Sequence, residues 1–258
     1  MASMPPLLPV ADAREQMLRA AIALGTEQVP ILDAHGRVLA TDLTAARTQP
    51  PFANSAMDGY AVRAQDVTNP PVTLSVSGIS AAGRRFEGTV GAGEAVRIFT
   101  GAPLPEGTDA IVIQEDVETI VDSGNVTVLE ASEPGQYVRP RGLDFHEGET
   151  LLNAGMALNA PRTALAAALG HATVEVKRRP TVALLSTGDE LVAPGEPCGP
   201  DQIVSSNVYG VGAMVNQAGG QARQLGIAPD DPKIIAARLE AGLTDGCDVL
   251  VTTGGASV

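Results

Sequence analysis

Residues 180–258 alternate apolar runs with helix-like segments, and this alternation constrains the fold more than any other feature of the sequence. The run VALL at 182–185 is apolar at every position, which is typical of a strand buried on both faces. The expected elements, in chain order, are a strand at 182–185, a helix at 207–218, a strand at 221–227, a helix at 232–243 and a strand at 248–251. This βαβαβ order predicts half of a doubly wound parallel α/β sheet.

A different pattern fills residues 71–129, where short stretches alternate apolar and polar residues between Gly, Pro, Asp and Ser turns. The stretches are 72–76, 95–99, 110–113 and 125–129. They predict a small antiparallel β-domain, either a sandwich or a barrel.

The segments around this β-domain show weaker signals. Residues 11–24 have helical spacing, with Asp12 as the expected N-cap and Met17 and Leu18 on the apolar face. Residues 36–40 fit either a strand or a helix. A helix is expected at 161–169 and a strand at 173–176.

The composition excludes several classes of function. With 17 basic and 30 acidic residues the formal charge is −13, which argues against nucleic acid as a partner. An acidic protein that binds an anion needs a metal ion or backbone N–H groups to supply positive potential.

Cysteine and histidine usage gives no sign of a zinc site or a disulfide. Cys198 and Cys247 form no CxxC pair, and His35, His146 and His171 lie far apart. The N-terminal residues lack the basic start of a secretory signal, and no apolar run reaches membrane-spanning length. We therefore expect a soluble, cytoplasmic protein that contacts no membrane.

Polar residues follow each of the three expected strands of the α/β region. The segments are STGDEL at 186–191, DDP at 230–232 and TTGGAS at 252–257. The carboxyl ends of parallel strands share one edge of a sheet, where ligands bind. Hydroxyls, backbone N–H groups and carboxylates there suit a phosphate-bearing ligand, with Mg²⁺ as a bridge.

Turn and cap chemistry is the competing explanation for these three segments. In particular, Asp231 followed by Pro232 is typical of an N-cap and a first helical position. A helix-capping role is also the alternative for Asp230. The pattern alone does not decide between the two explanations.

A single carboxylate, Asp58, stands in the segment NSAMDGYAV at 54–62, directly before Gly59. The residues PPF at 50–52 stiffen the entry to this segment. Asp-Gly is common turn chemistry, and by itself the segment favours a turn over a metal-binding or catalytic carboxylate.

Seven segments, in one order along the chain, carry a family resemblance. They are PPFANSAMDGYAV (50–62), RIFTGAPLPEGTDAIVIQED (97–116), RPRGLDF (139–145), STGDEL (186–191), SSN (205–207), DDP (230–232) and TTGGASV (252–258). Together they resemble the molybdopterin molybdenumtransferase family, to which the gephyrin E domain belongs. The resemblance extends over essentially the whole chain.

The resemblance implies a multidomain α+β and α/β fold. It comprises a split N-terminal domain (residues 1–50 and 140–179), an inserted small β-domain (51–139) and a partial doubly wound, molybdopterin-binding-like α/β domain (180–258). The family also has a C-terminal β-domain, and its GGVSVG segment precedes an acidic residue, whereas this sequence ends at GGASV. We therefore expect a C-terminally truncated member of this family. The resemblance also implies an elongated homodimer.

The resemblance further implies insertion of molybdate into adenylylated molybdopterin, with Mg²⁺ present and AMP released. Catalytic positions carried over are Asp58, Thr100 and Asp144, and metal-binding positions are Glu190 and Asp230. Asp58 would reach across the dimer to the α/β domain of the partner. The positions expected to bind the pterin substrate are Ser186, Thr187, Gly188, Asp189, Ser206, Asn207, Gly254, Gly255 and Ser257.

Three other functions compete with this one. An adenylyltransferase of the related fold would consist of little more than the α/β domain, and residues 1–179 argue against it. A scaffold of the gephyrin type and a pterin or molybdate carrier without catalysis remain as alternatives. As further partners we expect the molybdopterin adenylyltransferase and molybdoenzyme chaperones.

Overall fold

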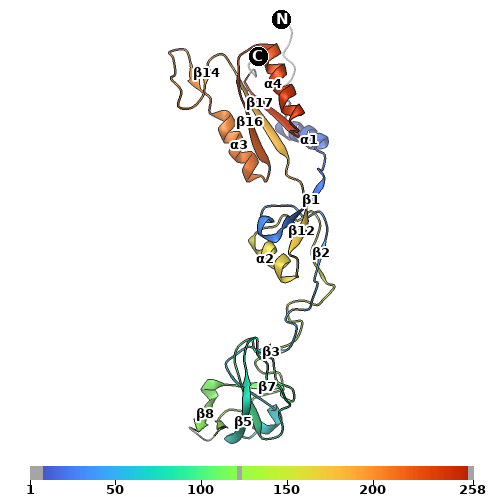
Figure 1. The fold of residues 1–258 in the computed structure, drawn as a ribbon, viewed down its shortest axis with the longest axis vertical. Coiled ribbons are helices and arrows are strands. Elements are labelled where there is room, and N and C mark those ends of the chain that lie inside the picture. The colour runs from blue at the N-terminus through green and yellow to red at the C-terminus, as the bar shows by residue number, and fades with distance from the viewer. Residues whose placement is uncertain (1–7, 121–123, 255–258) are drawn as a thin grey trace. The chain divides into compact units, whose positions relative to one another are not determined.

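The computed structural model describes residues 8–120 and 124–254 and falls into two compact units (Figure 1). Unit 1 comprises Met1–Asp42, Asn153–Ala164 and Ala172–Val258, and unit 2 comprises Leu43–Leu152 and Leu165–His171. Across the described residues, no helix combines the length and the apolar character needed to span a bilayer. The division into three domains stays a prediction.

The C-terminal part of unit 1 is a three-stranded parallel sheet with a helix on each face (Figure 1). Its elements are β13 (Thr181–Thr187), α3 (Asn207–Gln217), β16 (Gln221–Ala228), α4 (Pro232–Thr244) and β17 (Val249–Thr253). The strand order β16–β13–β17 confirms the expected βαβαβ arrangement, with β13 in the centre. A short parallel ladder of β14 (Leu191–Val192) and β15 (Ile203–Val204) lies between β13 and α3 in the sequence.

Alternate residues of the strands pack against different helices. On one face Val182 and Leu184 pack with Val208 of α3. On the other face a Cβ at Gly242 of α4 would come within 3.0 Å of Leu225 and 3.2 Å of Leu250. Burial of β13 on both faces explains why the apolar run was the clearest strand signal in the sequence.

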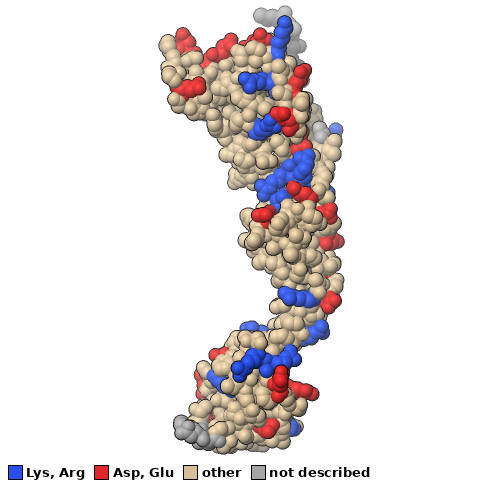
Figure 2. All heavy atoms as spheres, in the orientation of Figure 1, with Lys and Arg blue, Asp and Glu red and all other residues tan. Residues whose placement is uncertain are grey.

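The other part of unit 1 is built around an antiparallel ladder of β1 (Thr26–Pro30) and β12 (Thr173–Lys177). Lys and Arg side chains gather on the visible face over this ladder (Figure 2). The 3₁₀ turn η1 (Ile31–Asp33) follows β1, and α2 (Ala160–Ala168) confirms the helix expected at 161–169. The ambiguous segment 36–40 is neither a helix nor a regular strand, because Val38 and Leu39 form only isolated bridges.

The first helix, α1 (Val10–Ala20), differs from the prediction at its start, at its end, which lies four residues before residue 24, and in its burial. It begins two residues before Asp12, with Pro9 at the N-cap position and no side-chain capping bond. The side chains on its expected apolar face remain exposed, Met17 at 75% and Leu18 at 65%. The helical spacing of apolar residues predicted the helix. It did not predict burial, because burial of these side chains requires another part of the chain to pack against them.

Unit 2 contains a six-stranded sheet in the order β7–β4–β6–β5–β9–β8. The strands are β4 (Gly59–Val62), β5 (Val72–Ser80), β6 (Glu94–Ile98), β7 (Ala110–Ile113), β8 (Val117–Ile120) and β9 (Asn125–Val128). Its 3₁₀ turns are η2 (Ala64–Val67) and η3 (Gln114–Asp116). The expectation of a purely antiparallel domain is wrong, because β5 and β6 run parallel. Residues 81–93 connect these two strands, and about a dozen residues are enough for a parallel crossover.

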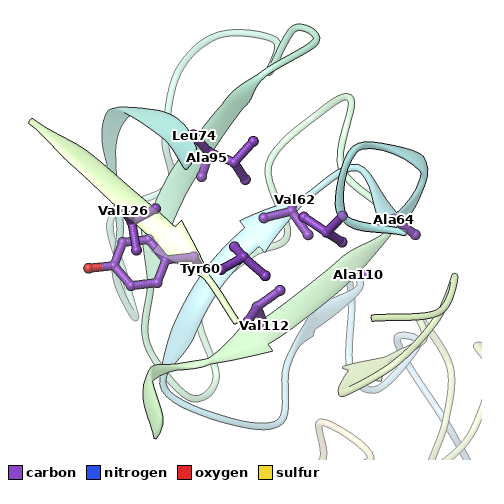
Figure 3. Close-up of a cluster of buried hydrophobic side chains, with 10 residues drawn as sticks. Tyr60, Val62, Ala64, Leu74, Ala95, Ala110, Val112 and Val126 are labelled. Carbon is purple, nitrogen blue, oxygen red and sulfur yellow. The ribbon is translucent and has the colours of Figure 1, made fainter. Parts of the chain in front are cut away.

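One face of this sheet carries the main apolar core of unit 2 (Figure 3). Tyr60 and Val62 of β4 point into it with Leu74 and Val126. The intervening Ala61 packs on the opposite face with Ile98 and Ile111. All four residues of β4 are buried, so the strand immediately after Asp58 is fixed from both sides.

Two short ladders complete unit 2. They pair β2 (Leu43–Thr44) with β11 (Thr150–Leu152), and β3 (Asn54–Ser55) with β10 (Val138–Arg139). The second ladder holds the chain that leads into Asp58.

Candidate functional site

Asp58 lies in the bend between β3 and β4, and main-chain hydrogen bonds fix both ends of this bend. On the entry side, the carbonyl of Ser55 accepts from the N–H of Gly101 at 2.8 Å. On the exit side, the carbonyl of Asp58 accepts from the N–H of Gln114 at 3.1 Å. Gly59 follows, and a Cβ there would lie 2.0 Å from the carbonyl oxygen of Val112. The close approach of β7 therefore requires glycine at this position.

Among the described residues, only Thr100 forms hydrogen bonds with the carboxylate of Asp58. The backbone N–H and the hydroxyl of Thr100 donate to the same oxygen, Oδ1, at 2.8 and 2.9 Å. These two hydrogen bonds, the backbone bond first, lower the pKa of Asp58, and the charge of Arg97 acts in the same direction. Within the described residues no hydrogen bond reaches Oδ2, so this oxygen is available to a ligand.

Arg97 supports the same bend and was missed in the sequence. Its guanidinium donates to the carbonyl of Gly59 at 3.1 Å and to Oε1 of Gln114 at 2.7 Å. It also lies over the rings of Tyr60 and Phe99, at 5.1 and 5.0 Å from their centroids. Arg97 lies on β6, three positions before Thr100 in the sequence. No pattern of neighbouring residues in the sequence links Arg97 to Gly59.

The structure places Asp144 close to this region but not in contact with the Asp58 carboxylate. The N–H of Asp144 donates to the carbonyl of Gln49 at 3.0 Å. Its side chain borders a cavity of about 370 Å³, which Asn54, Gly101 and Arg139 also line. Gly101 is the neighbour of Thr100, so the three predicted catalytic residues lie in one part of unit 2.

In unit 1, hydroxyl groups meet at the carboxyl ends of the parallel strands. The hydroxyls of Ser186 and Ser205 lie 2.9 Å apart, and that of Thr253 lies 3.4 Å from Ser186. Ser186 and Ser205 are both buried. From the SSN segment, the residue predicted to bind the substrate is Ser206, whereas the residue that joins this hydroxyl cluster is Ser205.

The loops after β13 and β17 approach each other at the same edge. Gly254 has φ +118°, and a Cβ there would lie 2.2 Å from the carbonyl oxygen of Thr187. Next to Thr187, the N–H of Gly188 donates to the carbonyl of Ala228 at 3.1 Å. The ends of all three strands are thus joined, as the pattern of polar segments predicted. Gly255 and Ser257 lie outside the described residues.

The acidic residues of this edge have distinct roles. Asp231 caps α4, because its side chain accepts from the N–H groups of Lys233 and Ile234. Asp230 instead donates its backbone N–H to Oδ1 of Asp189 at 3.1 Å. The alternative that Asp230 caps the helix is therefore wrong, and its carboxylate accepts no hydrogen bond from a described residue.

A cavity of about 510 Å³ opens beside these groups and is lined by Gly188, Asp189, Ser205 and Tyr209, among others. Asn207 begins α3, and Ser206 precedes it without a side-chain capping bond. The amino end of α3 therefore presents backbone N–H groups next to the predicted pterin-binding residues, a favourable place for an anion.

The described residues contain no group of three His, Cys, Asp or Glu side chains placed to hold a metal ion. Glu190 and Asp230 are both exposed at the strand ends. Mg²⁺ is commonly held by one or two carboxylates, with phosphate and water oxygens as its other ligands. In that setting Glu190 and Asp230 would supply the carboxylate oxygens, and the remaining ligands would come from phosphate and water.

Comparison with known proteins identifies relatives of both units. The family description "MoeA N-terminal region (domain I and II)" matches residues 8–170, and "Probable molybdopterin binding domain" matches residues 183–258. The molybdopterin molybdenumtransferase of Nostoc sp. is 40% identical over 237 residues, which cover 90% of this chain and 54% of that protein. The molybdopterin molybdenumtransferase of Haemophilus influenzae is 38% identical over 258 residues, covering 98% of this chain and 62% of that protein.

Solved structures agree with these matches. Two crystal structures of a molybdopterin biosynthesis MoeA protein from Pyrococcus horikoshii superpose with TM-scores of 0.80 and 0.86, at 37% and 34% identity. They cover 97% and 96% of this chain, which in turn covers 64% and 66% of those chains. The chain thus spans between about half and two thirds of the length of these relatives. On the match of residues 8–170, which is more than half of its length, the chain belongs to the MoeA family.

Proposed function

We propose that this chain acts in molybdenum-cofactor biosynthesis and inserts molybdate into adenylylated molybdopterin with release of AMP. The observation that carries the proposal is the Asp58 carboxylate, whose Oδ1 is held by Thr100 and whose Oδ2 has no hydrogen-bond partner among the described residues. A turn residue needs no such arrangement. Family membership supplies the class of substrate.

The state of Asp58 indicates what this carboxylate does. Because its pKa is lowered, it is ionised and a poor proton acceptor at neutral pH. We therefore assign it the role of a charged ligand that orients a cationic or N–H group of the reacting complex. Thr100 positions this charge through two donors without neutralising it.

The strand-end site of unit 1 would hold the pterin substrate and its phosphates. The hydroxyls of Ser205, which lines the cavity, and of Thr253, together with the amino end of α3, offer hydrogen bonds without adding negative charge. The fully buried Ser186 would position these two hydroxyls. Glu190 and Asp230 would hold Mg²⁺, which as a Lewis acid would offset the charge of the phosphoanhydride. In a chain of net charge −13, such local compensation is needed for any anionic substrate.

We further propose a homodimer in which Asp58 of one protomer serves the strand-end site of the other. Asp58 belongs to unit 2, whereas the strand-end residues belong to unit 1. Light scattering of the purified protein should report a dimer at micromolar concentration. A monomer that releases AMP at the full rate would contradict the shared site.

The central test is an AMP-release assay with purified protein, adenylylated molybdopterin, molybdate and Mg²⁺. We expect release that depends on both molybdate and Mg²⁺. Tight binding of the pterin without AMP release would favour the alternative of a non-catalytic carrier or scaffold.

The metal assignment is tested separately through Glu190→Gln and Asp230→Asn. Each should weaken Mg²⁺-dependent binding of adenylylated molybdopterin by about tenfold, because a ligand of the bridging ion is lost. Asp201→Asn, at an exposed acidic position of a nearby loop, is the matched control and should bind normally. Unchanged affinity in both variants would exclude this metal site.

A further inference from the structure

Unit 1 has a second cavity at the opposite edge of the parallel sheet, at the amino ends of β13, β16 and β17. Its volume is about 680 Å³, within the range of small-ligand pockets. On the side of the sheet, the cavity is lined by residues 178–180, 218–219 and 248–249. On the side of the β1–β12 ladder, it is lined by residues 21–24 and 36–38. None of these residues belongs to the strand-end site.

Aliphatic side chains form much of the cavity wall. Ile22 is 86% exposed, Val249 46% and Val38 37%. Each loses unfavourable contact with water if an apolar group enters the cavity. The cavity therefore favours a ligand with an apolar body.

The rim of the cavity is positively charged. Arg178 is paired with Asp248 through two hydrogen bonds, at 3.0 and 2.6 Å. Lys177 and Arg179 also line the cavity, and neither forms an ion pair with a carboxylate of the described chain. Figure 2 shows Lys and Arg side chains gathered in this part of the visible face. In a strongly acidic protein, this local excess of positive charge favours an anion.

Arg37 provides the second, independent observation. It lines the cavity and is only 7% exposed. Its Nη2 donates to the carboxylate of Glu27 and, at 2.9 Å, to the carbonyl of Lys177. Its Nε is buried, and no described residue forms a hydrogen bond with it. The two printed hydrogen bonds use only Nη2, and Arg37 lines the cavity, so a carboxylate that enters there can be bound by the remaining donors of this guanidinium.

We propose that this cavity binds a small organic anion in which one carboxylate is joined to an apolar body. The carboxylate lies against Arg37 and Lys177, and the apolar body covers Ile22, Val38 and Val249. The site is separate from the proposed molybdate chemistry, because it lies at the amino ends of the strands.

Phenylbutyrate is a suitable probe, with the neutral phenylbutanol and the cationic phenylbutylamine as comparisons. Binding is measured by amide chemical-shift titration of the purified protein. We expect phenylbutyrate to bind at least tenfold more tightly than phenylbutanol, phenylbutylamine to bind more weakly still, and the shifts to map to residues 21–24, 36–38 and 177–180. Equal affinity of the acid and the alcohol, or shifts confined to other regions, would overturn the proposal.

Two variants locate the site. Ile22→Asp places a negative charge on the cavity wall and should weaken phenylbutyrate binding at least tenfold, whereas Leu32→Asp should leave it unchanged. Leu32 is the matched control because it is 91% exposed and lies outside the cavity. Arg37→Gln should abolish the preference for the acid over the alcohol.

The outcome remains decisive if Arg37→Gln does not fold, because Ile22 is exposed and its replacement leaves the fold intact. Normal phenylbutyrate affinity in Ile22→Asp would refute the site. AMP release by Ile22→Asp should equal that of the unchanged protein, so this result is independent of the proposed function.

Discussion

Asp58 and Asp248 are two carboxylates with lowered pKa, and the causes differ. For Asp58 the largest contributions are the N–H and hydroxyl of Thr100, which are neutral donors. For Asp248 the largest contribution is the guanidinium of Arg178, followed by the N–H of Thr181. Hydrogen bonds from neutral groups stabilise a charge and leave it uncompensated, whereas an arginine cancels it. A lowered pKa alone therefore does not identify a functional carboxylate. Asp58 differs from Asp248 in that no described residue forms an ion pair with it, although the charge of Arg97 makes a smaller contribution to its lowered pKa.

The largest effect that separates the two carboxylates is expected for Asp58→Asn. Asparagine tolerates the same bend, so the melting temperature should stay within about 2 °C of the unchanged protein. AMP release should fall by about 100-fold or more, because a charge that acts in the transition state is lost. Asp248→Asn, the control for loss of a carboxylate elsewhere, should retain full activity. Near-normal AMP release by Asp58→Asn would show that Asp58 is only a turn residue.

A smaller effect is expected for Thr100→Val, which removes the hydroxyl donor and keeps the backbone N–H. AMP release should fall about tenfold at neutral pH, because the carboxylate is less firmly oriented. The pKa of Asp58 should rise toward its ordinary value, so the acid limb of the pH–rate profile should move to higher pH. Thr100→Ser keeps the hydroxyl and should restore both the rate and the acid limb. An unchanged acid limb in Thr100→Val would contradict the assigned hydrogen bond.

The third effect concerns stability and applies to Asp248. In Asp248→Asn, Arg178 loses its ion pair, and the melting temperature should fall by about 3 °C with no change in AMP release. Asp245→Asn breaks the more exposed ion pair with Arg223 and should lower the melting temperature by less. Equal losses in the two variants would mean that the Asp248 pair contributes no more than an exposed one.

The smallest effect is the pH dependence of that stability difference. Asp248 has a folded-state pKa below its ordinary value of 3.8, so its contribution to stability is present above that value. The contribution is lost as the pH falls through the folded-state pKa. Urea unfolding of Asp248→Asn and of the unchanged protein should therefore differ at pH 6, and the difference should vanish as the pH falls through the folded-state pKa, which lies below 3.8. A gap that stays constant down to acid pH would exclude the ion pair as its cause.

The α/β part could be predicted from the sequence because its signals are local. The apolar run of β13 and the helical spacing of α3 and α4 require only neighbouring residues for their interpretation. In unit 2 the signals were incomplete. The strand β4 begins with Gly59 and is buried on both faces, so it showed no alternation. The parallel pairing of β5 and β6 depends on the path of residues 81–93, which no local pattern specifies.

In the candidate site, too, local patterns could be predicted from the sequence and long-range contacts could not. The polar segments at the strand ends predicted a shared edge, and the hydroxyl cluster lies there. The contacts within this cluster could not be predicted, because Ser186 meets Ser205 across 19 positions and Thr253 across 67; the choice of Ser206 as a binding residue stays a prediction. Ser205 and Ser206 are equivalent in sequence, and only the direction of each side chain distinguishes them.

The sequence by itself determined the βαβαβ order, the cap at Asp231 and the family, since these depend on residue type and spacing. Only the tertiary structure decided that Thr100 binds Asp58 from 42 positions away and that Arg97 supports Gly59. It also placed Arg37 beside a cavity at the amino ends of the strands. The physical reason is that hydrogen bonds and ion pairs act over a few ångströms in space. Which distant residues come within that range depends on the packing of the whole unit.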